Sequence, residues 1–297
     1  MVWASGWKLA SAVSNNGCLG LIGSGSMKPD LLREHIKKCK NAAEKPFGVN
    51  IPLLRGDVEA LIDVVIEENI KIVFSSAGHP GKYIDRLKKH DITVFHVVPS
   101  VKYGKKAESV GCDGVVGEGV EAGGHNGLDE ITTFTLIPQL ADELKIPVIA
   151  AGGISDGRGI AAAFCLGAEG VQIGTRFAVT KESSAHENYK YSVVNASDHD
   201  THLILKKLGM ARVIKNKFSS EIEKLEQECI DNEKIKLFMG NKREMRGIFN
   251  GEYDEGMLEA GQGSGLIKEI PTVAELINRL VYEFNFELKK LKGFQGE

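Results

Sequence analysis

Apolar residues recur between residues 7 and 174 in short runs that alternate with amphipathic segments. Runs rich in Val and Ile, without strict polar alternation, are typical of strands buried on both faces. Repeated strand–helix alternation predicts a parallel sheet covered by helices. The predicted strands are residues 18–22, 46–51, 70–75, 92–98, 113–117, 146–151 and 170–174. The predicted helices are residues 7–16, 29–42, 57–68, 80–89, 102–110, 134–144 and 156–166.

Seven such strands are one fewer than a closed TIM (β/α)8 barrel contains. We therefore expect a β/α barrel that lacks its first strand, with a strand upstream of Met1 completing it. From about residue 181 the rhythm changes to polar, partly helical sequence, with helices expected at residues 221–228 and 272–287. The predicted domains are a barrel, residues 1–180, and a mostly helical C-terminal region, residues 181–297, that covers the barrel mouth.

Composition narrows the functional class. The 297 residues carry a net charge of −3, which gives no basic surface for nucleic acid or anionic membranes. No apolar run approaches the roughly 20 residues of a membrane span, and the first residues do not form a signal peptide. The five cysteines lack metal-site or disulfide-framework spacing, so we expect a reducing cytoplasm. No metal site is predicted, because His186, His199 and His202 lack ligand spacing with carboxylates.

A glycine-rich loop with one histidine follows the fifth predicted strand. Residues 118–127 read Glu-Gly-Val-Glu-Ala-Gly-Gly-His-Asn-Gly, with His125 among four glycines. Glycine lets backbone approach a flat ligand closely, and imidazole exchanges a proton near neutral pH. Since β/α barrels keep their chemistry at the carboxyl ends of strands, His125 is the candidate catalytic residue.

The two following strands also end in glycine. Gly152 and Gly153 close the sixth strand, and Gly174 and Thr175 close the seventh. Counting a missing first strand, these are positions seven and eight, whose loops and helix N-terminus commonly bind phosphate in such barrels. Close strand-to-helix packing is the alternative reason for these glycines.

Three segments together resemble a known family. Residues 121–127 (Glu-Ala-Gly-Gly-His-Asn-Gly), 150–154 (Ala-Ala-Gly-Gly-Ile) and 174–176 (Gly-Thr-Arg) look like the nitronate monooxygenases, formerly 2-nitropropane dioxygenases. The flavin-dependent type II enoyl-acyl carrier protein reductases share the pattern. The resemblance covers nearly the whole chain and implies an FMN-binding TIM barrel.

The resemblance also implies roles for individual residues. His125 matches the catalytic histidine, and Gly123 and Gly124 belong to its motif. The remaining positions that match the flavin site are Met1, at a turn beside the flavin, Asn50, near the flavin ring or substrate, and Gly152, Gly153, Gly174 and Thr175, in the phosphate cradle. The family's first strand and glycine turn are absent from this sequence, so we expect reduced flavin affinity.

Three functions are compatible with these residues. The first is FMN-dependent oxidation of alkyl nitronates by oxygen to a carbonyl compound and nitrite, with His125 as base or anion holder. The second is FMN-dependent, NAD(P)H-consuming reduction of enoyl thioesters, with acyl carrier protein as partner. The third is a barrel that binds a phosphorylated ligand without redox chemistry. A small-molecule substrate is expected in each case, and a homodimer is the expected assembly.

The sequence gives weaker support for a functional role of other polar residues near strand ends. Glu118 and Glu121 could steer the His125 loop, but two carboxylates on a turn are more often solvated. His79 follows a strand end and could line the site, whereas His96 lies within a strand and is expected in the core or at the mouth. Ser75, Ser76 and Cys112 lack the sequence context of a nucleophile.

Overall fold

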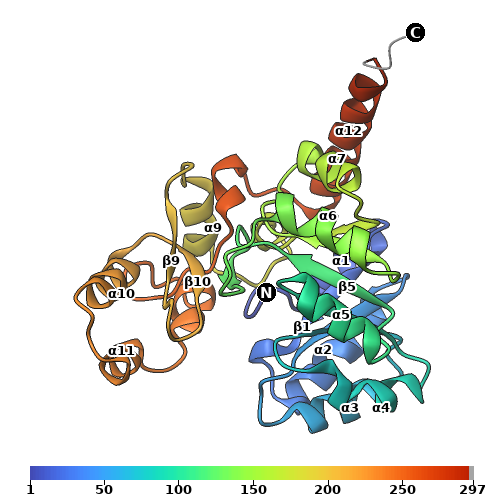
Figure 1. Ribbon diagram of the computed structural model, residues 1–297, viewed down its shortest axis with the longest axis horizontal. Coiled ribbons are helices and arrows are strands. Elements are labelled where there is room, and N and C mark those ends of the chain that lie inside the picture. The colour runs from blue at the N-terminus through green and yellow to red at the C-terminus, as the bar shows by residue number, and fades with distance from the viewer. Residues whose placement is uncertain (294–297) are drawn as a thin grey trace.

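The computed structural model describes residues 1–293. Seven parallel strands form one curved sheet, the barrel, whose order follows the chain: β1-β2-β3-β4-β5-β7-β8 (Figure 1). All seven predicted strands are present, with ends shifted by a few residues. The strands are β1 (Gly20–Gly23), β2 (Phe47–Pro52), β3 (Ile72–Ser76), β4 (Thr93–Val98), β5 (Gly114–Glu118), β7 (Val148–Ala151) and β8 (Gly170–Gln172).

Helices connect these strands and cover the outside of the sheet. Local sequence explains where they begin: Pro29 occupies the first turn of α2, and the Asp156 carboxylate accepts from two amides at the start of α7. The predicted helix at residues 80–89 divides into a 3₁₀ turn, η2 (Pro80–Lys82), and α4. The helices of this half are α1 (Trp7–Asn15), α2 (Pro29–Ala42), α3 (Val58–Glu67), α4 (Ile84–Lys88), α5 (Val101–Ser109), α6 (Thr133–Glu143), α7 (Gly157–Cys165) and α8 (Thr175–Ala178), with 3₁₀ turn η1 (Ser24–Ser26) after β1.

The sheet is open between its two end strands, β1 and β8, which share no ladder among the described residues. Residues near Met1 meet β1 instead. The Gly23 amide donates to the Ser5 carbonyl at 2.9 Å, and the Ser5 hydroxyl donates to the Leu21 carbonyl at 2.6 Å. The expected barrel of seven strands is thus confirmed.

Two apolar layers lie on the two faces of the sheet. The larger core joins the outer face to the helices and includes Val49, Val73, Val115 and Val148. The smaller lines the barrel interior with Phe74, Phe95, Val116 and Ala151. The register pairs Glu118 with Ala151 and Ala151 with Gln172. Because paired residues lie on the same face of a sheet, all three side chains lie at one level of the barrel interior, at the carboxyl ends of their strands.

A second, antiparallel sheet stands apart from the barrel and forms the lobe, residues 201–239 (Figure 1). Its strands are β9 (Thr201–Ile204) and β10 (Ala211–Ile214), which pairs on its other edge with β6 (Gly124–His125) of the glycine-rich loop. Helices α10 (Lys217–Gln227) and α11 (Asn232–Met239) complete the lobe. The sequence predicted a mostly helical region here but not β9 and β10, because runs such as Ala211–Ile214 are too brief to show a strand period.

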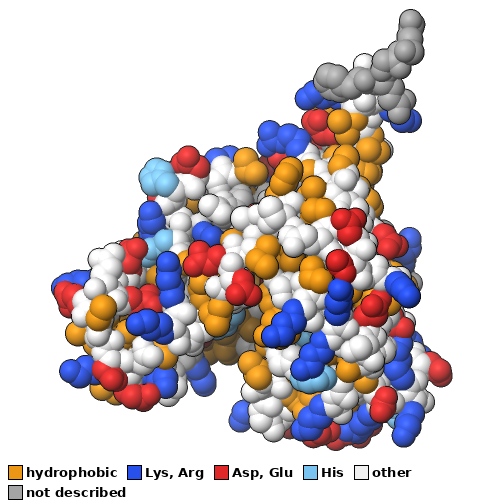
Figure 2. All heavy atoms as spheres, viewed as in Figure 1, with side chains coloured by type: hydrophobic (Ala, Val, Ile, Leu, Met, Phe, Trp, Pro, Cys, Tyr) orange, Lys and Arg blue, Asp and Glu red, His pale blue; other side chains and the backbone are white. Residues whose placement is uncertain are grey.

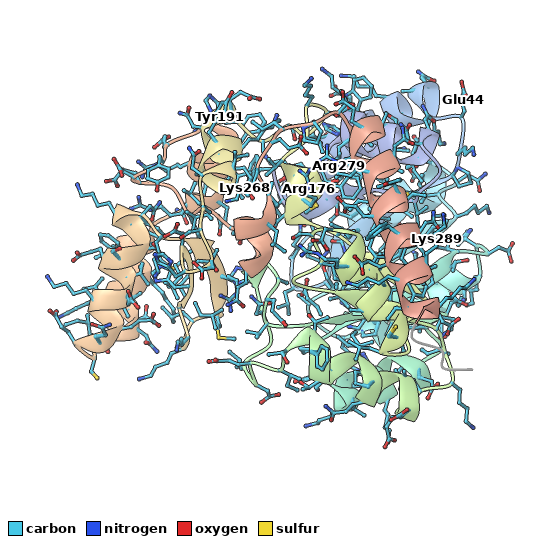
Figure 3. The ribbon with its side chains drawn as sticks, turned by 90° about the horizontal axis from the view of Figure 1, so that it is seen from above. Glu44, Arg176, Tyr191, Lys268, Arg279 and Lys289 are labelled. Atoms are coloured by element: carbon cyan, nitrogen blue, oxygen red, sulfur yellow. The ribbon has the colours of Figure 1, made fainter. Side chains whose placement is uncertain are left out.

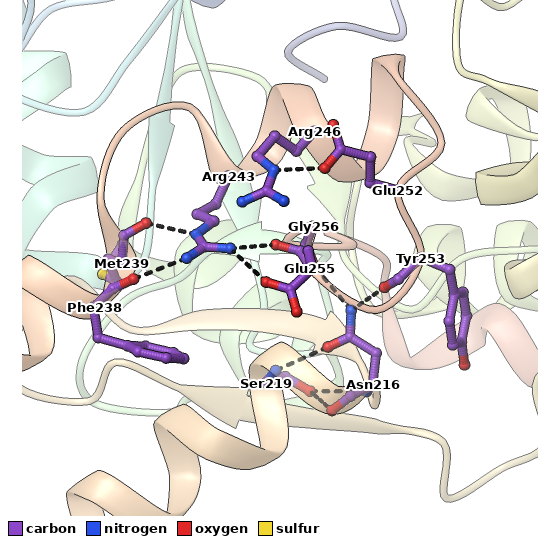
Figure 4. Close-up of polar contacts among 10 residues, drawn as sticks. All are labelled: Asn216, Ser219, Phe238, Met239, Arg243, Arg246, Glu252, Tyr253, Glu255 and Gly256. Atoms are coloured by element: carbon purple, nitrogen blue, oxygen red, sulfur yellow. Dashed lines mark hydrogen bonds and ion pairs between the residues drawn. The ribbon is translucent and has the colours of Figure 1, made fainter.

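Residues 240–261, the return segment, lead from the lobe back to the barrel. Arg243 fixes its start by donating to the carbonyls of Met239 (2.7 Å), Phe238 (2.9 Å) and Glu255 (2.7 Å), and Asn216 donates to the Gly256 carbonyl at 2.8 Å (Figure 4). The π-helical turn η3 (Met245–Phe249) lies within this segment, which passes beside α9 (Glu187–Val194).

The chain ends in η4 (Gln262–Leu266) and the long helix α12 (Val273–Lys292). Thr272 and Glu275 form a capping box at the start of α12. The buried Arg176 guanidinium binds the Glu269 carboxylate at 3.1 Å, and Arg279 of α12 binds the same carboxylate (Figure 3). These contacts attach the first half of α12 to the barrel.

Candidate active site

His125 lies where the barrel meets the lobe. It is the second residue of β6, opposite Ala211 of β10. Its Nδ1 lies 2.9 Å from the Gly209 carbonyl oxygen, which can only accept a hydrogen bond, so Nδ1 carries the proton. The imidazole is exposed, and its Nε2 is left for a substrate or a nearby side chain. The structure therefore holds the ring in one tautomer while presenting a titratable atom.

Two carboxylates of the return segment lie beside this imidazole. Val213 of β10 forms an antiparallel bridge with Glu259, two positions along from the pair of Ala211 with His125. Positions two apart share a face of a sheet, so Glu259 and His125 face the same side. Ligand-capable atoms of His125, Glu244 and Glu259 all lie within 4.8 Å of one another. Sequence reasoning missed both glutamates, since Glu244 and Glu259 are 119 and 134 positions from the histidine in the chain.

The electrostatics of these groups depend on burial. Burial raises the pKa of Glu259, and the neighbouring His125 opposes that rise. Burial also raises the pKa of Glu118, at the end of β5, to about 7; the chain's amino terminus opposes this and Glu259 adds to it. A carboxyl with a raised pKa retains its proton closer to neutral pH. The mouth thus combines one imidazole with three acidic groups, of which two resist ionisation.

The predicted cradle glycines differ in their surroundings. A side chain at Gly123 would collide with the backbone of Ala260 and Gly261, and one at Gly152, where φ is +100°, would collide with Gly119. Gly153 has φ of +70°, a conformation that favours glycine. Gly174 is different: a Cβ there would meet only the Met1 side chain, at 3.8 Å. Packing accounts for Gly123 and Gly152, whereas a Cβ at Gly174 would make only an ordinary contact with Met1.

The Thr175 hydroxyl accepts a hydrogen bond from the Gly261 amide at 2.9 Å. It therefore ties the glycine-rich C-terminal segment to the barrel mouth, while its own hydrogen remains available to donate. The start of α7 is occupied by protein: Asp156 caps it, and the Gly157 amide donates to Glu283 of α12 at 2.9 Å. The N-terminus of α7 is consequently satisfied within the chain.

Comparison with known proteins identifies the fold family. The sequence model described as nitronate monooxygenase matches residues 1–60 and 56–283. The chain belongs to the nitronate monooxygenase family. FabK from Thermotoga maritima is 43% identical over 99% of this chain and 93% of its own, with a TM-score of 0.94. The predicted family, close to the flavin-dependent enoyl-acyl carrier protein reductases, is confirmed.

Two curated relatives have different names. A probable nitronate monooxygenase of Bacillus subtilis is 33% identical, covering 93% of this chain and 91% of its own length. A dehydrogenase of a carboxyl-CoA derivative of an indene, from Rhodococcus jostii, is 31% identical, covering 95% and 90%. The nitroalkane oxidase of Streptomyces ansochromogenes, at 24% identity and a TM-score of 0.86, shares the fold. Membership of this family makes the chain an oxidoreductase of the flavin-dependent type and sets aside a barrel without redox chemistry.

Features of the barrel interior fit the flavin that members of this family use. The Gln172 Oε1 atom is buried without a hydrogen-bond partner among the described residues, on the interior level shared with Glu118. Buried amide oxygens rarely remain unpaired, so a ligand donor is expected there. The Asn50 side chain lies in reach of the same mouth and accepts a 3.3 Å hydrogen bond from Ser76. An unpaired amide oxygen at Gln172 and a loosely packed glycine at Gly174 suit a polar-edged ring system.

The remaining sequence candidates have structural partners. Glu121 accepts from the amide and hydroxyl of Thr133 and so fixes the glycine-rich loop to α6. His96 lies in the outer core, where Ser75 Oγ is 2.8 Å from its Nδ1 and burial lowers its pKa to about 4. His79 accepts from the Gly81 amide, and Cys112 is buried. None of the helices in the described residues could span a membrane.

Proposed function

We propose that this chain is an FMN-dependent reductase of enoyl thioesters that consumes NAD(P)H, with His125 as its proton donor. The observation that carries the proposal is the placement of His125 beside the carboxylates of Glu244 and Glu259, with an atom of each group within 4.8 Å of the others. Carboxylates next to an imidazole balance the charge of its protonated form. Glu244, and Glu259 when a protonated His125 keeps it ionised, also repel an anionic substrate, which favours a neutral thioester over a nitronate anion.

Similarity supports the same substrate class. Identity to FabK, at 43%, exceeds identity to the probable nitronate monooxygenase of Bacillus subtilis, at 33%. The Rhodococcus relative is named for a CoA thioester substrate. The substrate of this chain is then an α,β-unsaturated acyl group carried as a thioester by acyl carrier protein or coenzyme A.

Different residues of this chain would bind FMN and transfer the proton. Gln172 and Asn50 would bind the polar edge of the FMN ring. Gly174 would leave room for the FMN phosphate, and the Thr175 hydroxyl would contact it. When bound, FMN supplies the hydride transfer. His125 Nε2–H donates a proton to the α-carbon of the thioester, while the Gly209 carbonyl keeps Nδ1 protonated and the ring in place.

Oxidation of alkyl nitronates by oxygen is the second candidate function. The family match and the Bacillus relative favour it. His125, with Nδ1 donating to Gly209, has its Nε2 lone pair free in the neutral ring and could abstract the α-proton of a nitroalkane. This activity requires that the anionic nitronate be tolerated beside Glu244 and Glu259.

Anaerobic flavin reduction separates the two functions. The full chain is loaded with FMN, and NADPH, NADH and a propyl nitronate are added separately without oxygen. We expect a nicotinamide to bleach the flavin absorbance and a short enoyl-CoA to restore it. Bleaching by the nitronate alone, with neither nicotinamide reacting, would overturn the proposal in favour of nitronate oxidation.

A further inference from the structure

Three side chains from distant parts of the chain converge on one point at the barrel mouth. Ligand-capable atoms of His125, Glu244 and Glu259 all lie within 4.8 Å of one another. A point equidistant from three atoms 4.8 Å apart lies about 2.8 Å from each (4.8 Å divided by the square root of three), and zinc binds imidazole nitrogen and carboxylate oxygen at about 2.0–2.2 Å. Shifts of less than about 1 Å in each side chain would therefore bring all three groups to bonding distance of one ion.

The imidazole is already oriented as a metal-binding histidine would be. Its Nδ1 lies 2.9 Å from the Gly209 carbonyl oxygen and donates to it, which leaves the Nε2 lone pair of the neutral ring free. Metal-binding histidines almost always donate their other ring N–H to a carbonyl or carboxylate, which fixes the tautomer and the ring orientation. Gly209 has φ of +114°, a conformation that favours glycine, so the turn that supplies this carbonyl is specified by the sequence.

The two carboxylates carry charge that the surrounding protein does not balance. Among residues 1–293, neither the Glu244 nor the Glu259 carboxylate has a hydrogen-bond or ion-pair partner. Burial and the neighbouring Glu244 both raise the pKa of Glu259, whereas His125 and the chain's amino terminus oppose that rise. A protonated imidazole balances one carboxylate, but a divalent ion between the two would balance both.

Space beside the histidine is reserved for one of these carboxylates. A Cβ at Gly124, the residue before His125 in β6, would lie 3.2 Å from the carboxyl carbon of Glu259. The glycine therefore lets the Glu259 carboxylate lie close against β6, next to the imidazole. The ligands come from β6 and from two places in the return segment, so the spacing of residues along the chain gives no sign of the site.

We propose that His125, Glu244 and Glu259 bind a divalent metal ion of the zinc class, and that the bound ion inhibits the enzyme by occupying Nε2 of His125. One imidazole and two carboxylates are suitable ligands for zinc, whereas calcium and magnesium prefer oxygen ligands alone. The inhibition rests on the proposed role of His125 as proton donor. Binding of the ion does not, because it depends only on the three ligands.

Zinc titration of the flavin-loaded full chain, in competition with a chromophoric chelator, tests the site. We expect one tightly bound ion per chain, and calcium or magnesium at the same concentration should not displace it. His125→Ala, Glu244→Gln and Glu259→Gln should each weaken binding by at least about tenfold, since even loss of an outer partner of a metal ligand costs about 10–100-fold. Zinc should also raise the melting temperature of wild type and not that of His125→Ala. Unchanged affinity in all three variants would overturn the proposal.

The control is a second histidine with neighbouring carboxylates. Figure 2 shows Asp and Glu side chains scattered among Lys and Arg over the barrel and the lobe, and such groups bind metal ions weakly. His199 is the exposed counterpart, because its Nδ1 lies 3.0 Å from Asp198 and its Nε2 lies 3.8 Å from Asp200. His199→Ala should leave the tight zinc site intact. If His199→Ala removes that site and His125→Ala does not, the proposed ligands are wrong.

Turnover measured in the same samples separates this site from the proposed function. One equivalent of zinc should abolish turnover of an enoyl thioester by wild type, and a chelator should restore it. Zinc that binds through His125 without slowing turnover would overturn the inhibition and also count against His125 as proton donor. Absence of binding at His125 would overturn the metal site and leave the proposed function as it stands.

Discussion

The barrel and the lobe differ in the size of their hydrophobic cores and in the residues they contribute to the site. The barrel has a large continuous core that runs from α1 to α7 and includes fully buried residues such as Ile51, Leu136 and Ile137. The lobe has a small separate core around Ile204, Val213 and Ile222. The barrel provides a rigid mouth with Gln172 and Gly174, whereas the lobe and the return segment bring Gly209, Glu244 and Glu259 to His125. The proposed cofactor site and the proposed proton-transfer site therefore rest on different cores, and their contributions should be separable.

The largest effect is expected at the residue that both halves position. His125→Ala should lower turnover by about 10²–10⁴-fold, the usual contribution of a general acid or base. The exposed imidazole contributes little to either core, so flavin content and melting temperature should stay near wild type. Steady-state rates and flavin absorbance measure both. A loss smaller than about tenfold would remove His125 from the chemistry.

Truncation of one isoleucine in each core tests whether the two halves are separable. Ile137→Ala in the barrel and Ile222→Ala in the lobe both remove fully buried side chains. Each should cost about 2–5 kcal/mol in its own region. Ile137→Ala should lower flavin content and activity together, whereas Ile222→Ala should lower activity with flavin retained. Equal flavin loss in both variants would show that barrel and lobe unfold as one unit.

The difference between the regions also explains what the sequence could reveal. Barrel strands are buried on both faces, so each forms an apolar run bounded by glycine, and all seven were predictable. In the lobe, Thr201–Ile204 and Ala211–Ile214 are short and separated by polar turns, so they show no strand period. His125 was recognisable from its glycine-rich loop. Glu244 and Glu259 carry no local motif: the antiparallel bridge to Val213 of β10 brings Glu259 to the imidazole, and the fold of the return segment brings Glu244 within 4.8 Å of both.

Glu118, at the end of β5, should make the stability of the folded chain depend on pH. Burial raises its pKa to about 7 in the folded chain, from 4.5 when unperturbed. The folded state then holds more protons than the unfolded state between these values, so stability falls as pH rises from about 4.5 to 7. Glu118→Gln should remove this penalty, worth about 1–3 kcal/mol after allowance for partial exposure. Its melting temperature should exceed wild type at pH 8 and match it near pH 4.5.

The control for that experiment is Glu228→Gln, which changes an exposed carboxylate in the turn after α10. It should leave the melting temperature unchanged at both values of pH. A Glu118→Gln variant that gains the same stability at pH 4.5 as at pH 8 would show that the gain comes from packing, and the raised pKa would not be its cause.

On the side of the return segment, Glu259→Gln keeps the shape of the side chain and removes its charge. If the carboxylate stabilises the protonated imidazole, turnover with an enoyl thioester should fall about tenfold, equivalent to about 1.4 kcal/mol. Flavin content should not change, since Glu259 belongs to the segment beside the lobe. The rate should begin to fall at a lower pH than in wild type as pH is raised, because His125 would lose its proton more readily without the carboxylate. An unchanged profile would mean that Glu259 only fills space beside Gly124.

The smallest effect is expected within the barrel mouth, where two glycines test the cofactor site directly. Gly174→Ala introduces a methyl group that meets only the Met1 side chain, at 3.8 Å, and its φ is not in the left-handed region. Folding should therefore be unaffected, while FMN should bind a few-fold more weakly if its phosphate approaches this backbone. Gly123→Ala is the contrasting variant, because its methyl group would collide with Ala260 and Gly261 and destabilise the fold. Flavin titration and thermal denaturation of both variants separate the two effects: a Gly174→Ala protein that binds FMN as tightly as wild type would place the phosphate elsewhere in the mouth.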